Sequence, residues 1–228
     1  MGVIGNTTSP AHDLASPCLH LEHWDLIAVL YDHGVYPTLF CPPELFLSIV
    51  RINHLRHRAA HDCFMGDSLQ REAEKILRYT QQHSSESWAA SLPSSGTGLV
   101  LVSSIYQSAV MVYCISSLQS LGVLPDSAVS RSLMKWHKRR LGMLLKEALG
   151  SLPRRHIMTK CMTWPLVIFG MQANTEEGKY VLQELTTIAY DIGSYLPIIA
   201  SSVLERFWLS GATGWDDCFH KPFIYINT

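Results

Sequence analysis

The longest uncharged stretch of the chain limits the folds that are open to it. No Asp, Glu, Lys or Arg occurs between Glu86 and Asp126, and residues 99–124 within this stretch are mostly apolar. A helix of that length could span a bilayer, or it could form the buried centre of a helical domain. Polar side chains interrupt the apolar run and favour the buried helix: Ser103, Ser104, Gln107, Ser108, Ser116, Ser117 and Gln119.

Helical periodicity in the rest of the chain predicts an all-α fold. Prolines at the start of one segment suit a first helical turn, Asp67 suits the N-cap of the next, and Gly193 and Gly211 suit helix ends. We expect a loose N-terminal leader over residues 1–20. A single large domain of packed antiparallel helices then follows over residues 21–228, with an irregular aromatic C-terminal tail. The predicted helices cover residues 41–58, 67–83, 99–124, 125–149, 159–173, 175–193 and 195–208.

Composition argues against a freestanding nucleic-acid-binding protein and against a secreted protein. Only 16% of the residues are charged, against about 25% in an average soluble domain, so most of the chain should be buried. The net charge is −1, which gives no basic excess for neutralising phosphates. The six cysteines form no C-x-x-C pair and the start of the chain does not read as a secretory signal. These features indicate a reducing, intracellular setting.

Histidines at zinc-like spacing form the first candidate site. His54, His57 and His61 lie on one face of a predicted helix, and the last two have the i,i+4 spacing that zinc sites use. However, no glutamate follows the first histidine of this pair, and three neighbouring bases repel a cation. We therefore interpret the segment, which also contains Arg51, Arg56 and Arg58, as a solvated basic helix face without a metal.

A second basic cluster lies further along the chain. No Asp or Glu occurs between Asp126 and Glu147, and the helix predicted in this interval is amphipathic. We expect Leu133, Trp136 and Leu141 to face inward, which leaves the bases solvated. Such a cluster could also serve as an interaction or import surface. We refer to it as the basic patch: Arg131, Lys135, Lys138, Arg139 and Arg140.

The C-terminal segment brings acid, thiol and imidazole groups close together in sequence. Asp216 and Asp217 are adjacent, so on an extended chain they point to opposite sides and make a poor acid–base pair. Glycines before them and Pro222 after them indicate a turn. We expect the surrounding aromatic residues to dock this tail on the helices. No nucleophile, phosphate-loop or cofactor motif occurs elsewhere, and the sequence predicts no enzyme, cofactor or metal.

Two C-terminal segments carry a resemblance to a known family. The segments "MTWPLVIFGMQA" at 162–173 and "VLERFWLSGATGWDDCFHKPF" at 203–223 resemble the C-terminal region of fungal-specific transcription factors of the binuclear zinc cluster type. A weaker match lies at 24–56, where a Pro-Pro-Glu-Leu helix is followed by "INHLR". His220 departs from the pattern, because an acidic residue is common there. The motif positions are Trp164, Pro165, Phe207, Trp208, Trp215, Asp216, Asp217, Cys218, Phe219 and Pro222.

The resemblance implies the regulatory domain of a nuclear transcription regulator, one that could control a metabolic or secondary-metabolite gene cluster. It also implies protein partners, namely the transcription machinery, a DNA-binding subunit or a second copy. The zinc cluster of the family needs six closely spaced cysteines, which this sequence does not contain. We therefore expect no direct DNA binding. The resemblance to a family of nuclear regulators also argues against membrane insertion. The alternative is a helical enzyme or small-ligand-binding protein of a metabolic pathway.

Overall fold

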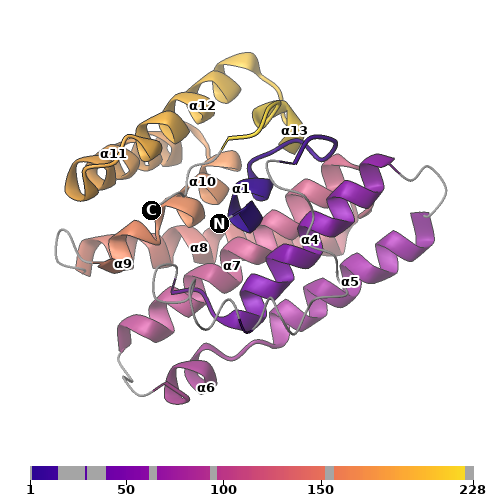
Figure 1. Ribbon diagram of the computed structural model, residues 1–228, viewed down its shortest axis with the longest axis horizontal. Coiled ribbons are helices and arrows are strands. Elements are labelled where there is room, and N and C mark those ends of the chain that lie inside the picture. Colours follow the sequence, from indigo (N-terminus) through magenta and orange to yellow (C-terminus); the bar gives the residue numbers. More distant parts are fainter. Residues whose placement is uncertain are drawn as a thin grey trace.

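The computed structural model of the protein describes residues 2–14, 29, 40–61, 66–92, 97–151 and 157–223. Regular structure in this part of the chain is helical and includes no strand, which confirms the predicted all-α fold. Figure 1 shows the helices packed around a central one, α7. The helices are α1 (Gly2–Thr7), α4 (Pro43–His61), α5 (Gly66–Gln82), α6 (Ser85–Ala90), α7 (Thr97–Ser120), α8 (Ala128–Ser151), α9 (Ile157–Lys160), α10 (Thr163–Met171), α11 (Thr175–Ile192), α12 (Leu196–Ser210) and α13 (Trp215–Cys218).

The uncharged stretch forms the centre of the domain. Helix α7 packs against α4, α5, α6, α8, α10 and α13, and the segment from Gly98 to Ser120 is long and apolar enough to cross a membrane. However, 83% of its most apolar window is buried inside the protein. The Gln107 side chain donates to the backbone oxygens of Thr80 and His83, at 3.0 and 2.9 Å. The Gln107 side chain therefore has hydrogen-bond partners inside the domain, as expected of a buried core helix.

Caps fix the ends of the C-terminal helix pair. The Asn174 side chain accepts hydrogen bonds from the backbone of α11, and Glu177 reaches back to the Asn174 backbone in a capping box. Gly193 and Gly211 end α11 and α12 with φ values of 64° and 69°, which glycine adopts without steric cost. All nine residues of α10 are buried. Pro165 lies in its first turn, so it begins the helix and does not kink it.

The N-terminal residues are not a loose leader where the structure describes them. Helix α1 packs on α4, and the residues from Val3 to Ala11 are buried. Asn53 of α4 donates to the Val3 carbonyl at 2.7 Å. Apolar residues are few in this segment, so its composition resembled that of a disordered end. Residues 15–20 of the predicted leader and residues 224–228 of the tail lie outside the described residues.

One residue of helix α8 does not have its predicted orientation. Leu141 is buried as expected and Leu133 is half-buried, but Trp136 is 55% exposed while His137 is 2% exposed. The buried positions start at His137 and continue four, five, eight and eleven residues later. One residue turns a helix by about 100°, so Trp136 falls outside this stripe and its predicted inward orientation is wrong.

Candidate functional site

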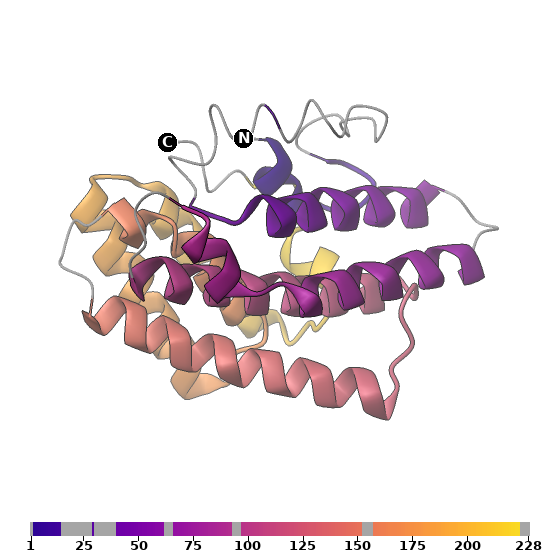
Figure 2. The ribbon, with the colours of Figure 1, turned by 90° about the horizontal axis from the view of Figure 1, so that it is seen from below.

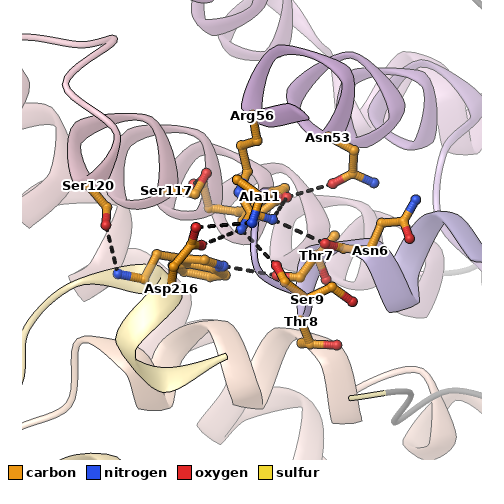
Figure 3. A network of polar contacts seen from close by, with 12 residues as sticks. Asn6, Thr7, Thr8, Ser9, Ala11, Asn53, Arg56, Ser117, Ser120 and Asp216 are labelled. Atoms are coloured by element: carbon orange, nitrogen blue, oxygen red, sulfur yellow. Dashed lines mark hydrogen bonds and ion pairs between the residues drawn. The ribbon is translucent and has the colours of Figure 1, made fainter. Parts of the chain in front are cut away.

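The aromatic tail forms a closure over the helical core. We use "closure" for residues 214–223, which contain the short helix α13. Asp217 begins that helix by accepting a hydrogen bond from the Gly214 N–H at 3.0 Å. The Trp215 N–H donates to Ser120 at the end of α7, at 3.1 Å. Asp216 lies on the other side of the turn and points toward Arg56 of α4 (Figure 3).

Arg56 of α4 lies at the centre of a buried polar network (Figure 3). Its side chain is 0% exposed, and one terminal nitrogen is 2.6 Å from a carboxylate oxygen of Asp216. The same guanidinium donates to the backbone oxygens of Asn6 and Ser9, at 3.1 and 2.8 Å. The second carboxylate oxygen of Asp216 accepts from the Ala11 N–H at 3.0 Å. This ion pair therefore joins the N-terminal segment, α4 and the closure.

The network continues through a tyrosine of the central helix. Arg56 donates to the Tyr113 hydroxyl at 3.1 Å, and this hydroxyl donates to Asn53 at 2.6 Å. Thr7 receives a hydrogen bond on its hydroxyl from the Trp164 indole at 2.8 Å and one on its carbonyl from the Trp215 indole at 2.9 Å. Two of the three motif tryptophans, Trp164 and Trp215, thus bind the N-terminal segment.

The electrostatics of the network keep it in one charge state. Burial opposes the charged form of Arg56, but the Tyr113 oxygen and Asp216 outweigh it and raise the pKa of the guanidinium. Burial raises the pKa of Tyr113 to about 12, against the opposing charge of Arg56. Near neutral pH the arginine is therefore charged and the tyrosine neutral. Such an arrangement binds segments together and offers no acid or base for catalysis.

Arg56 corrects the prediction of a solvated basic face on α4. The other bases of this helix, Arg51 and Arg58, are partly exposed, whereas Arg56 is fully buried. Sequence reasoning treated the three alike because they carry the same charge. A usable signal was the spacing: Asn53 and Arg56 follow Ile49 and Ile52 at helical intervals, which places them on the apolar face.

The motif residues separate into two groups. Trp164, Trp215 and Phe219 are buried around Tyr113 and Tyr106, with ring centroids 5.0 to 6.3 Å apart. The second group lies on α12, where Trp208 donates to the Gly170 carbonyl at 3.1 Å. Of the remaining motif residues, Pro165, Phe207 and Cys218 are buried, Asp216 and Pro222 are half-buried, and Asp217 is exposed.

The acid, thiol and imidazole of the closure do not meet in a reactive site. Cys218 is buried, and burial raises the pKa of its thiol, whereas His220 is exposed. Burial likewise raises the pKa of Cys161 to about 12, so neither thiol is an activated nucleophile. Among the described residues, no group of three His, Cys, Asp or Glu side chains could hold a metal ion. Cys18, Cys63 and His156 lie outside the described residues.

Comparison with known proteins agrees with the motif. The family model "Fungal specific transcription factor domain" matches residues 1–221. The chain belongs to this family. A phomenoic acid biosynthesis cluster-specific transcriptional regulator of Leptosphaeria maculans is 34% identical over 230 residues, which is 99% of this chain and 43% of the relative. The chain thus spans less than half the length of that relative. No solved structure matches the chain.

The basic patch of this fungal transcription factor domain is only partly a solvated face. Lys138 pairs with Glu177 of α11 at 2.7 Å, and Arg140 donates to Gln107 of α7 at 3.0 Å. Partial burial opposes the ionisation of Glu177, but hydrogen bonds from Lys138 and the Asn174 backbone outweigh it and lower the pKa of the carboxyl. Arg131 pairs with Asp126 on the surface. Lys135 and Arg139 are exposed.

A cleft of about 1210 Å³ lies between the end of α10 and the helices α11 and α12 of the fungal transcription factor domain. Its apolar wall includes Leu182 and the motif residue Trp208, and its rim carries Lys179, Glu205 and Arg206. The indole of Trp208 lies against Gly178 of α11, where a Cβ would be 3.2 Å from the ring. Glycine at this position therefore allows the motif tryptophan to form the cleft wall.

Proposed function

We propose that the chain is the regulatory domain of a nuclear transcription regulator that controls a biosynthetic gene cluster. The observation that carries the proposal is the match of nearly the whole chain to one family, together with a relative named as a cluster-specific transcriptional regulator. The domain acts through protein contacts, with the transcription machinery, a DNA-binding subunit or a second copy. It has no enzymatic activity in this role.

The physical basis for a non-catalytic role lies in the motif itself. Asp216, Arg56 and Tyr113 bond one another inside the core. Nothing in this arrangement exposes an activated nucleophile to solvent. The motif instead stabilises the surface that the domain presents to partners.

A promoter-recruitment assay tests the proposal. The chain is fused to a known DNA-binding module and expressed in a filamentous fungus with a reporter that carries the module's site. We expect reporter output to change relative to the module alone, and the effect to be lost with Trp215→Ala, which removes a fully buried anchor of the closure. A folded fusion that reaches the nucleus and leaves the reporter unchanged would contradict the proposal.

Direct DNA binding is tested separately. The net charge is −1, and three bases of the patch, Arg131, Lys138 and Arg140, have partners within the domain. We expect the purified chain to bind duplex DNA no better than a non-specific acidic protein at physiological salt. Sequence-specific, sub-micromolar binding would show that the chain reads DNA itself.

The cleft favours a second candidate function, the binding of a small effector. Pockets for drug-sized ligands measure about 300–1,000 Å³, so the cleft, with a volume of about 1210 Å³, is large enough to hold one. We expect a compound from a panel of fungal metabolites to raise the melting temperature of the protein. Ser202→Trp, which fills the exposed side of the cleft, should abolish that shift. A shift that survives this change would place the compound elsewhere.

A further inference from the structure

Large apolar side chains form a straight stripe on the outer face of α8. Val129 is 77% exposed, Trp136 55% and Met143 57%. Each is seven residues from the next, which is two helical turns, so all three lie on one side of the helix. Helix α8 runs along the outer edge of the molecule in Figure 2. We call these three residues the α8 stripe.

The N-terminal half of the α8 stripe borders a groove. Val129, Leu133 and Trp136 line it together with Gln81 at the end of α5, and its volume is about 590 Å³. The three α8 positions have the i, i+4, i+7 spacing with which one helix contacts another. The groove therefore has the geometry to accept apolar side chains from an added helix.

Positive charge flanks the stripe on both sides. Lys135 and Arg139 are exposed, and neither forms an ion pair with a described carboxylate. Arg140 lies over the Trp136 ring with its guanidinium carbon 5.3 Å from the centroid. No acid occurs in α8 before Glu147. An added helix would thus meet apolar side chains along its centre and bases along its edges.

We propose that the α8 stripe is the docking site of an acidic amphipathic helix from a protein partner. This inference rests on the proposed function only in taking protein contacts as the mode of action. The heptad spacing selects a helix that crosses α8 at about 20° and inserts an apolar residue at each seventh position. The exposed bases select glutamate or aspartate at the flanking positions of that helix.

The same charges argue against two other occupants. A second copy docked through α8 would place Lys135 and Arg139 near the identical bases of its partner, which is unfavourable. Nucleic acid would use the bases but leave Val129 and Met143 exposed, because phosphate contacts are electrostatic. An acidic helix satisfies both the apolar and the charged features.

Fluorescence anisotropy with a designed peptide tests the inference. The probe is a labelled helical peptide three heptads long, with leucine at every first and fourth heptad position and glutamate at the flanking positions. Two control peptides have the same composition with the apolar spacing scrambled, or the same spacing with lysine in place of glutamate. We expect saturable binding of the probe and at least about tenfold weaker binding of both controls.

Two pairs of matched variants assign the binding to α8. Trp136→Ala should weaken binding about tenfold or more, whereas Tyr190→Ala, which removes an 81% exposed ring from α11, should not. Lys135→Glu with Arg139→Glu should weaken binding in a salt-dependent way. The same charge change on α5, Lys75→Glu with Arg78→Glu, should have a much smaller effect. Unchanged melting temperatures verify that the variants fold.

Several outcomes would overturn the inference. The inference fails if the probe does not bind, if the scrambled peptide binds as tightly as the probe, or if Trp136→Ala binds the probe as tightly as the unaltered protein does. Self-association that Trp136→Ala abolishes, or duplex DNA that competes for the stripe, would replace the acidic helix with another occupant. The recruitment assay stands apart from this test, because a fusion that still regulates while the probe fails to bind would overturn only the docking site.

Discussion

Two adjacent aspartates of the motif have different physical roles. Asp216 is the counterion of a fully buried arginine, whereas Asp217 is exposed and caps a short helix. Removing one partner of a buried ion pair costs several kcal/mol, because the other charge remains buried. Changing the capping side chain of Asp217 to asparagine costs less, because the asparagine amide still provides an oxygen that accepts the hydrogen bond.

We therefore predict unequal effects of the same substitution at neighbouring positions. Asp216→Asn should lower the free energy of unfolding by about 2–3 kcal/mol, since Arg56 loses its counterion. Asp217→Asn should lower it by less than about 1 kcal/mol. Urea denaturation at neutral pH measures both. Equal losses would mean that the ion pair adds nothing beyond a hydrogen bond.

His137 makes the stability of the domain depend on pH. Its side chain is buried, and within the described structure neither ring nitrogen has a hydrogen-bond partner. Burial, assisted by the charge of Arg140, lowers the pKa of His137 to about 4. The folded imidazole is therefore neutral where the unfolded one, with a pKa near 6.5, takes up a proton.

The resulting loss of stability lies between pH 6.5 and 4. Above this window His137 is neutral in both states, and as the pH falls only the unfolded state gains the proton, so folding weakens by at most about 3 kcal/mol. His137→Leu should reduce this pH dependence without lowering stability at pH 7 by more than about 1 kcal/mol. Denaturation at several pH values measures it. Leucine in place of the exposed His12 should leave the slope unchanged.

The closure shows which contacts can be predicted from the sequence and which cannot. Asp216, Trp215 and Phe219 could be assigned to a docking tail from their aromatic setting. The structure buries the two rings and pairs Asp216 with a buried arginine. The partner of Asp216 could not be assigned, because Arg56 lies 160 positions away. Charge alone suggested solvent for Arg56, and only the fold supplies the buried counterion that permits the opposite.

At the level of secondary structure, prediction succeeded where local signals were strong. Helix α11 has its capping residues and its final glycine, and α7 has an apolar run too long for anything but a helix in this fold. Helices α1 and α6 were missed because each is six residues long. Short helices gain most of their stability from packing, which a local pattern does not contain.

The close approach of α8 to α10 depends on one glycine. A Cβ on Gly142 would be 2.8 Å from the Phe169 ring, whereas a Cβ on Gly150, in the same helix, would contact nothing within 4 Å. Gly142→Ala should therefore destabilise the domain by about 1–3 kcal/mol through overpacking. Gly150→Ala should stabilise it by about 0.5 kcal/mol, because alanine favours the helical backbone. Thermal unfolding of both variants measures the difference, and a stabilising Gly142→Ala would refute the contact.

Across the whole molecule, the two ends of the described chain form one unit. Thr8 and Phe223 exchange hydrogen bonds, since the Phe223 N–H donates to the Thr8 carbonyl at 3.0 Å and the Thr8 hydroxyl donates to the Phe223 carbonyl. Arg56 bonds both segments at once. The sequence indicated a loose start and a docked end. Their mutual dependence arises only because the fold brings both to α4.

Loss of the central guanidinium should therefore release both ends together. In Arg56→Met the backbone oxygens of Asn6 and Ser9 and the carboxylate of Asp216 lose their shared donor, and unpaired buried groups favour local opening. Hydrogen exchange should accelerate in residues 2–11 and 214–223 alike, while α5 and α11 keep their protection. Arg58→Met is the control, because Arg58 lies on the same helix and pairs with Glu72 near the surface. Faster exchange at only one end would show that the two segments are held independently, and the network would then be two separate contacts that share one arginine.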